Sequence, residues 1–148
     1  MIIVLFGQPH SGKTTLANAI KQERDVEIID GDQLRDIFQN KDYSKEGRIK
    51  NLNRASDIAH YLNSTTDKDV ILALVYPYKE AREYLNSLDS NVKWVYLVYE
   101  VDRGREKFHV SDFDYPTENE ALYLNTEWLE IEDCKNQILS YVDKETTR

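Results

Sequence analysis

Short apolar runs alternate along this chain with longer segments in which apolar residues recur every three or four positions. Each run predicts a strand covered on both faces, because a buried parallel strand is apolar almost throughout. The predicted strands are Ile2–Phe6, Val26–Ile29, Asp69–Val75, Val92–Tyr99 and Ala121–Leu124. Their alternation with helices predicts an α/β fold, a parallel five-stranded sheet with helices on both faces.

The segments between these strands have the spacing of amphipathic helices. The longest runs from Glu46 to about Asn63 and carries an apolar stripe. Other helices are predicted at Lys13–Glu23, at Gln33–Gln39, after Pro77, and at the C-terminus, where Ile131, Cys134, Ile138 and Val142 share one face. Ligands of such folds bind beyond the carboxyl ends of the strands, so residues that follow the strands are expected to share one cleft.

Composition narrows the class of protein. The 148 residues include 41% hydrophobic side chains, enough for the core of one domain that spans residues 1–148. The formal net charge is −8 and no basic block is present, which argues against a nucleic acid as the main partner. A small anionic substrate in a local basic pocket remains compatible with this charge.

Cysteine content and hydropathy bear on the compartment. The single cysteine, Cys134, rules out an internal disulfide and a zinc cluster of cysteines, as expected in a reducing cytosol. No signal peptide precedes Ile2, and no apolar run has the ~20 residues that a membrane span needs. We therefore expect a cytoplasmic protein with no membrane partner.

The first strand leads into a phosphate-binding pattern, G-x-x-x-x-G-K-[ST], at Gly7–Thr14. Its glycines permit backbone angles that turn N–H groups inward, and the next helix adds the positive end of its dipole. Lys13 would contact the β- and γ-phosphates of ATP, and the Thr14 hydroxyl would ligate Mg²⁺. A chance match in a turn is the alternative, but the flanking strand and helix favour ATP binding. The predicted ATP-binding residues are Gly7, Gln8, Pro9, His10, Ser11, Gly12, Lys13, Thr14 and Thr15.

Two carboxylates follow the second predicted strand, beside this loop. A kinase needs a carboxylate to orient the attacking hydroxyl, and Mg²⁺ at the β- and γ-phosphates. Asp32 suits the role of catalytic base and metal ligand, and Asp30 suits a polar contact to the substrate or to a metal-bound water. Arg35 lies one helical turn after Asp32 and can face the same cleft. The alternative is structural: Asp-Gly forms a turn and Asp32 caps the next helix.

Two polar segments could contact an anion. Residues 101–117 are irregular and include three cations, Arg103, Arg105 and Lys107. Such a long loop is typical either of a lid over the phosphates or of a solvated surface loop, and composition does not decide between them. On the long helix, Arg48, Asn51 and Arg54 recur every three residues and offer one polar face for a phosphate or sulfate. An ordinary solvated helix face has the same pattern.

Beyond the phosphate-binding loop, five motifs in order resemble those of the adenylyl-sulfate kinases. Asp30–Arg35 is similar to the family's D-G-D-x-x-R, and Tyr43–Arg54 to its F-S-x-x-x-R-x-x-N-x-x-R. Val75–Glu83 is similar to S-P-[FY]-x-x-x-R, Phe108–Tyr115 to F-T-G-I-D-x-x-Y, and Leu124–Thr126 to L-x-[ND]-T. The resemblance covers nearly the whole chain, and it implies a P-loop NTPase fold and a kinase that uses ATP and Mg²⁺.

The resemblance also implies roles for polar residues of the second and third motifs. By their place in the family pattern, Asp30 and Arg35 would contact the substrate, and Asp32 would act at the reacting hydroxyl and Mg²⁺. Arg48 and Asn51 match the residues that hold the phosphosulfate of the substrate.

Two aromatic residues gain a function from the same resemblance. Tyr43 and Phe108 match the pair that stacks on the substrate adenine, where each stacked face contributes on the order of 1–3 kcal/mol. Core packing is the alternative, and it is the commoner fate of a Phe or Tyr.

The chain departs from the family pattern at three places. Tyr76 replaces the serine before proline that carries phosphate in some members, so direct transfer from ATP is expected. The lid is shorter, with Asp102–Lys107 in place of a longer basic segment, and His109-Val110 replaces threonine-glycine after the stacking Phe. These changes affect the prediction of the substrate more than the prediction of the class of reaction.

The sequence therefore predicts a kinase that moves the γ-phosphoryl group of ATP to the ribose 3′-hydroxyl of adenosine 5′-phosphosulfate. Two alternatives stay open: a kinase for another nucleotide or nucleoside, and a nucleotide-binding regulatory protein in which catalysis has lapsed. A homodimer is a further expectation from the resemblance, because the family commonly forms one.

Overall fold

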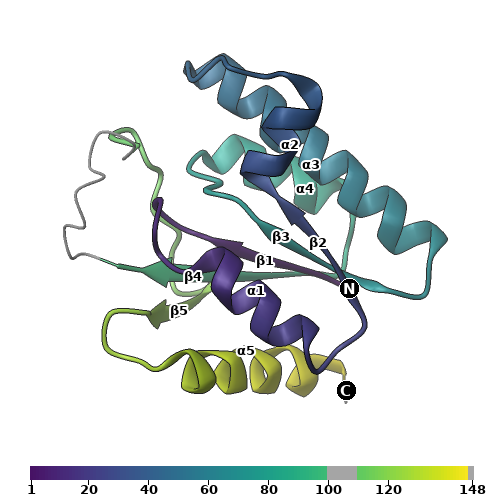
Figure 1. Ribbon diagram of the computed structural model, residues 1–148, viewed down its shortest axis with the longest axis vertical. Coiled ribbons are helices and arrows are strands. Elements are labelled where there is room, and N and C mark those ends of the chain that lie inside the picture. The colour runs from purple at the N-terminus through teal and green to yellow at the C-terminus, as the bar shows by residue number, and fades with distance from the viewer. Residues whose placement is uncertain (100–109, 147–148) are drawn as a thin grey trace.

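The computed structural model describes residues 1–99 and 110–146. Within them, parallel strands form one sheet in the order β2-β3-β1-β4-β5 (Figure 1). The strands are β1 (Ile2–Phe6), β2 (Val26–Asp30), β3 (Asp69–Ala73), β4 (Val92–Val98) and β5 (Leu122–Asn125). The helices are α1 (Lys13–Lys21), α2 (Gly31–Phe38), α3 (Lys45–Thr65), α4 (Lys79–Leu88) and α5 (Ile131–Thr146). The predicted five-stranded parallel α/β fold is confirmed.

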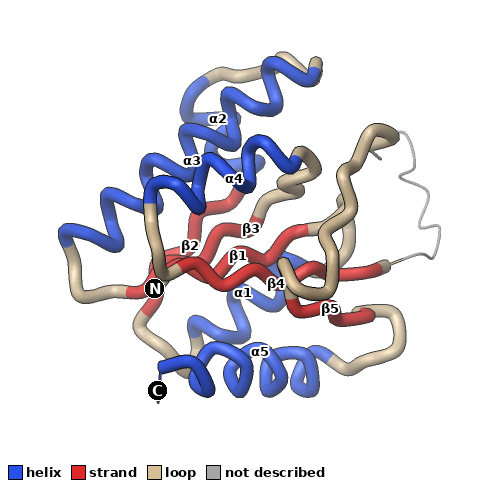
Figure 2. The backbone as a smooth tube through the Cα atoms, turned by 180° about the vertical axis from the view of Figure 1, so that it is seen from behind, coloured by secondary structure: helices blue, strands red, loops and turns tan. Residues whose placement is uncertain are grey.

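Helices cover both faces of the sheet (Figures 1 and 2). α1 and α5 lie on one face, and α3 and α4 lie on the other, with α2 packed against α3. Each face has its own apolar cluster, which includes Ile20 and Ile138 on the first face and Leu52 and Leu85 on the second. In the described parts of the chain, no helix combines the length and the apolar character needed to cross a membrane.

β1 is the central strand and pairs with β3 on one side and with β4 on the other. All of its residues are buried, which explains why its apolar run shows no polar alternation. Because every strand pair is parallel, the carboxyl ends of the strands share one edge of the sheet. Gly7, Gly31 and Thr126 follow three of these strands directly, so the segments with predicted chemistry begin at this edge.

The start of α2 differs from the prediction. The helix begins at Gly31 and not at Gln33, because the Asp30 carboxylate accepts hydrogen bonds from the N–H groups of Asp32 (2.9 Å) and Gln33 (3.1 Å). These bonds satisfy N–H groups that lack a partner within the first turn of the helix. The residue that caps α2 is therefore Asp30 and not Asp32.

Tyr76 stands where the motif of the adenylyl-sulfate kinases has serine, and it is completely buried. Its hydroxyl lies 2.9 Å from the Oγ atom of Ser56 on α3, and its ring packs edge-on against Trp94 of β4 with 5.4 Å between centroids. Burial raises the pKa of this phenol. The side chain thus joins α3 to the sheet, and it offers no accessible site for a phosphoenzyme intermediate.

Candidate active site

The loop between β1 and α1 has the backbone shape that the phosphate-binding pattern predicts. Gly7 has a φ of +151°, and a Cβ atom there would lie 2.4 Å from the carbonyl oxygen of Leu97. Gly12 has a φ of +96° just before α1, a region that L side chains rarely adopt. Neither position accepts a side chain without strain, so the two glycines fix the path of the chain into α1.

Lys13 extends from the first turn of α1 back to this loop. Its ammonium donates hydrogen bonds to the carbonyl oxygens of Gln8 (2.9 Å) and Gly7 (3.2 Å). Burial lowers the pKa of Lys13 from 10.5 to about 8, and the carboxylates of Asp32 and Asp30 oppose part of this shift. An anion bound in the loop would favour the charged form that burial disfavours, so the ammonium is suited to a phosphate partner.

Thr14 and Asp30 join the start of α1 to the end of β2. The Thr14 hydroxyl donates to Oδ2 of Asp30 at 2.9 Å, while Oδ1 of the same carboxylate caps α2. Asp32 follows in the first turn of α2, where it is exposed. The sequence paired Thr14 with Asp32 as metal ligands, whereas the carboxylate that contacts Thr14 in the structure is Asp30.

The oxygen atoms of Thr14, Asp30 and Asp32 fit a hard divalent cation such as Mg²⁺, which prefers hydroxyl, carboxylate and water oxygens. Within residues 1–99 and 110–146, no group of three or more His, Cys, Asp or Glu side chains is arranged to hold a metal ion. A sparse oxygen donor set suits Mg²⁺, because this ion keeps several of its water ligands and binds phosphate oxygens of the substrate.

A large cavity of about 740 Å³ opens beside the phosphate-binding loop. It extends from the loop across the ends of β2 and β3 to α2 and α3. Its lining from the loop and α1 includes Pro9, His10 and Gly12–Thr15. Its lining from the other segments includes Asp30, Asp32, Arg35, Tyr43, Arg48 and Asn51. The structure thus brings together most of the residues predicted for ATP and for the substrate.

Arg35 and Tyr43 pack against each other on one side of the large cavity. The guanidinium carbon of Arg35 lies 4.2 Å from the centroid of the Tyr43 ring. Nη1 of Arg35 also donates to the carbonyl oxygens of Asn40 and Asp42, each at 3.2 Å, which orders the loop between α2 and α3. Tyr43 remains 61% exposed, so its ring offers a stacking surface whose position is fixed from behind by the cation.

Asn51 is the buried polar residue of the wall that α3 contributes. It is 4% exposed, and its Oδ1 atom has no hydrogen-bond partner among the residues that the structure describes. An unpaired buried polar group costs roughly 1–3 kcal/mol, so Asn51 at this place lowers the stability of the fold. Arg48 lies one helical turn before Asn51, lines the same cavity and adds a positive charge.

Some predicted site residues are not part of this arrangement. Phe108, Arg103, Arg105 and Lys107 lie outside the described residues, and their roles stay predictions. Of the predicted lid, residues 110–117 are described, and Val110 lines the large cavity. Arg54 lies over the ring of Phe38, 4.5 Å from its centroid, and it does not line the cavity.

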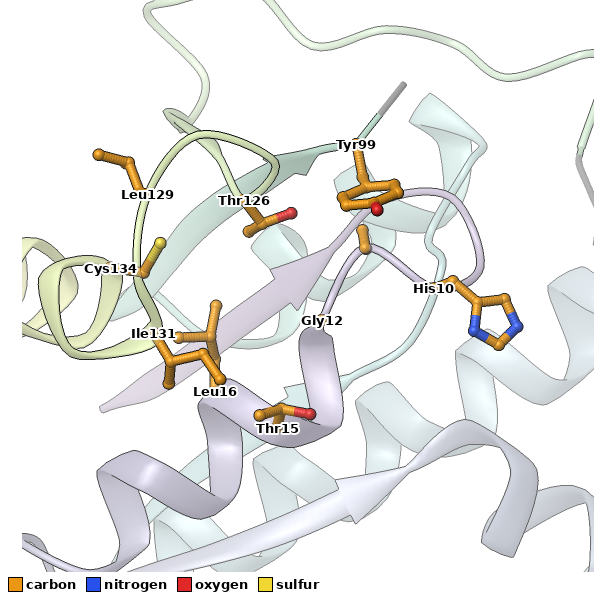
Figure 3. A pocket seen from close by; sticks show the side chains of 10 residues that line it. His10, Gly12, Thr15, Leu16, Tyr99, Thr126, Leu129, Ile131 and Cys134 are labelled. Atoms are coloured by element: carbon orange, nitrogen blue, oxygen red, sulfur yellow. The ribbon is translucent and has the colours of Figure 1, made fainter. Parts of the chain in front are cut away.

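A small cavity of about 160 Å³ lies on the other side of the phosphate-binding loop, against α5 (Figure 3). Figure 3 shows the imidazole of His10 turned away from the other labelled side chains of this cavity. The walls of the small cavity include Thr15, Leu16, Tyr99, Thr126, Leu129 and Cys134. Sequence reasoning gave none of these except Thr15 a site role, and the one available signal was the L-x-[ND]-T resemblance that ends at Thr126.

The fold and the site together define the class of the P-loop kinases. A parallel sheet presents a phosphate-binding loop, its lysine and two carboxylates to a cavity with cationic walls. Residues 1–107 match the adenylylsulphate kinase family. The chain belongs to this family.

Solved structures share the fold over almost the whole chain. The protein designated APE1195 is 26% identical, with a TM-score of 0.81 over 97% of this chain and 95% of that one. The adenylylsulphate (APS) kinase of Mycobacterium tuberculosis, solved in complex with AMPPNP and APS, has a TM-score of 0.81 and 17% identity over 96% of each chain. At that identity the likeness shows the fold alone.

One curated relative is named for a substrate other than adenylylsulphate. Cytidine diphosphoramidate kinase of Campylobacter jejuni is 29% identical over 101 residues, which are 65% of this chain. The match spans 59% of the length of that relative, less than two thirds.

Proposed function

We propose that this protein transfers the γ-phosphoryl group of ATP to the ribose 3′-hydroxyl of adenosine 5′-phosphosulfate. The observation that carries the proposal is the lining of the large cavity, which combines the phosphate-binding Lys13 and the carboxylate of Asp32 with Tyr43, Arg48 and Asn51. Tyr43, Arg48 and Asn51 resemble the substrate motif of the family to which the chain belongs.

The donor phosphates bind in the loop between β1 and α1. Main-chain N–H groups and the N-terminus of α1 attract the phosphate oxygens, and the Lys13 ammonium supplies the mobile counter-charge. This charge stabilises the oxygens on which negative charge develops during transfer. The base of ATP occupies the small cavity, because Tyr99 and Leu129 offer flat and apolar surface beside the loop.

Asp32 orients the acceptor hydroxyl and accepts its proton. The oxygens of Asp30 are already engaged by the Thr14 hydroxyl and by the first turn of α2. Asp30 therefore positions Thr14, which leaves Asp32 as the carboxylate that can approach the substrate. The oxygens of Thr14 and Asp32 would hold Mg²⁺, and the ion would neutralise charge on the β- and γ-phosphates.

The acceptor occupies the part of the large cavity between α2 and α3. Tyr43 stacks on the base, and Arg35 holds the ring of Tyr43 in place from the other side. Arg48 pairs with the anionic end of the acceptor, and the side-chain NH2 group of Asn51 donates a hydrogen bond to it.

A second candidate function is the phosphorylation of a different nucleotide, namely cytidine diphosphoramidate. The observation that favours it is the 29% identity to the kinase named for that compound. Stacking on Tyr43 does not distinguish the two acceptors, because every base presents a flat face to an aromatic ring.

A coupled assay for ADP release tests the proposal with both acceptors and with a panel of nucleosides and nucleotides. We expect the highest kcat/KM with adenosine 5′-phosphosulfate. Preference for cytidine diphosphoramidate or for another nucleotide would replace it with the second candidate. Tight ATP binding without turnover on any acceptor would support a regulatory protein instead.

A further inference from the structure

Gln8 is a residue of the phosphate-binding loop whose side chain is turned into the protein. It is 8% exposed and lines neither the large nor the small cavity. Its Nε2 atom donates to the carbonyl oxygen of Val110, and its Oε1 atom accepts from the N–H group of Val110, both at 2.9 Å. One carboxamide therefore satisfies both main-chain polar groups of a residue 102 positions away.

The main chain of Gln8 contacts the other functional element. Its carbonyl oxygen accepts a hydrogen bond from the ammonium of Lys13 at 2.9 Å and another from the N–H group of Ser11 at 3.3 Å. Val110, at the far end of the side chain, is 5% exposed and lines the large cavity. A single residue thus connects the cation of the phosphate-binding loop to a wall of the cavity assigned to the acceptor.

The segment that follows Val110 is anchored elsewhere. Asp114 accepts a hydrogen bond from the N–H group of Lys79 at 3.0 Å, and its carbonyl oxygen accepts one from Arg82 at 2.7 Å. Both of these partners belong to α4, on the face of the sheet that α3 and α4 cover. These anchors fix the segment to the body of the protein, while Gln8 fixes its beginning to the phosphate-binding loop.

We infer that Gln8 is a positioning residue that sets the distance between the phosphate-binding loop and the Val110 wall, so that acceptor binding depends on its carboxamide. Two hydrogen bonds to one residue restrain orientation as well as distance, and they are stronger in a buried place than in water. The inference rests on the proposed function, because it assigns the large cavity to the acceptor.

Replacement of Gln8 by Met tests the inference, because Met has a similar length but makes no such hydrogen bonds. We expect the KM for adenosine 5′-phosphosulfate to rise by about tenfold, since two buried main-chain groups lose their partners. The KM for ATP should change little, because the main-chain carbonyl of Gln8 is retained. Gln22→Met, at an exposed position just after α1, is the matched control and should leave both constants unchanged.

A second variant separates the two hydrogen bonds. Gln8→Glu keeps an oxygen that accepts from the Val110 N–H group but has no donor for the Val110 carbonyl. We expect amide hydrogen exchange at Val110, followed by NMR, to be fast in Gln8→Met and to stay slow in Gln8→Glu. The KM for the acceptor should rise in both variants.

Two results would overturn the inference. Unchanged exchange at Val110 in Gln8→Met would show that the carboxamide does not hold this residue. An equal rise in both KM values would show that Gln8 serves the phosphate-binding loop alone. Failure of the proposed function has a different signature, namely no ADP release by the unmodified protein with any acceptor, and the exchange measurement does not depend on that outcome.

Discussion

The two cavities beside the phosphate-binding loop differ in size and in chemistry. The small cavity, against α5, has about 160 Å³ and includes Leu16, Leu129, Ile131 and Cys134 in its lining. The large cavity, against α2 and α3, has about 740 Å³ and is lined by charged residues of both signs. Among the described residues, the lining of the small cavity contains no Asp, Glu, Lys or Arg, so this cavity selects mainly by shape, whereas a charged cavity selects by the position of charges and hydrogen bonds.

This difference follows from what packs behind each wall. α1 and α5 meet through an apolar cluster, so the surface next to the small cavity continues that cluster. α2 and the start of α3 project beyond the sheet edge, where their polar side chains need no apolar partner. We therefore expect changes in the loop to abolish the reaction and changes on α2 and α3 to alter which acceptor is used.

The largest effect is expected at the lysine of the phosphate-binding pattern, which lines the large cavity. Lys13→Ala should lower kcat by roughly 10²–10³-fold, because the transferring group loses a preorganised cation. Steady-state ADP release measures the loss, and Lys21→Ala in the last turn of α1 is the control of the same type. A kcat within twofold of the unmodified protein, a loss of about 0.4 kcal/mol or less in transition-state stabilisation, would refute the loop assignment.

Arg48→Ala should act on the large cavity alone. Loss of a charge-assisted hydrogen bond costs about 1.5–3 kcal/mol, so the KM for the acceptor should rise roughly 10- to 100-fold while the KM for ATP stays constant. Lys50→Ala removes an exposed charge two residues away on α3 and serves as the control. Parallel changes in both constants would mean that the two cavities are not separate in function.

The protonation of Lys13 should make ATP binding depend on pH. Because burial lowers its pKa to about 8, the free protein loses this charge as the pH rises through that value. ATP attracts the charged form, so kcat/KM for ATP should fall about tenfold between pH 7 and pH 9. Lys13→Arg keeps its charge over this range, and its residual activity should lack the decline. A flat profile in the unmodified protein would contradict the assignment.

The smallest of these effects is expected at Tyr43. Tyr43→Ala should raise the KM for the acceptor about fivefold, the lower end of what a stacked ring contributes, and Tyr43→Phe should restore it. The control is Tyr61→Ala, which removes an exposed tyrosine of α3 that is 65% exposed and does not line the large cavity. An effect of Tyr43→Ala on the KM for ATP of the same size would place the ring outside the acceptor site.

Most of the fold could be predicted because its signals are local. The apolar run Ile2–Phe6 and the stripe on α3 reflect burial of neighbouring residues in one element, and both were located from spacing alone. The start of α2 was missed by two residues. Several acidic residues near it could have capped the helix. Asp30, which does cap it, also contacts Thr14, 16 positions earlier, and sequence spacing does not reveal such a distant contact.

The candidate site was predicted unevenly for the same reason. The loop Gly7–Thr14 is continuous in sequence, so its pattern identifies it. The small cavity is lined by the phosphate-binding loop, by α1 and α5, and by the loop residues Tyr99, Thr126 and Leu129. Apart from the phosphate-binding loop, none of these segments has a sequence pattern that predicts a cavity. The burial of Asn51, whose Oδ1 atom has no partner in the described part of the chain, is also invisible in sequence, because a solvated helix face would have the same spacing.

By itself the sequence determined the parallel sheet, the phosphate-binding loop and the family, because each depends on the order of neighbouring residues. The tertiary structure alone decided which carboxylate contacts Thr14, that Tyr76 belongs to the core, and that Gln8 reaches Val110. Those outcomes depend on how distant segments pack, and the free energy of a buried hydrogen bond is set by the partner that packing supplies.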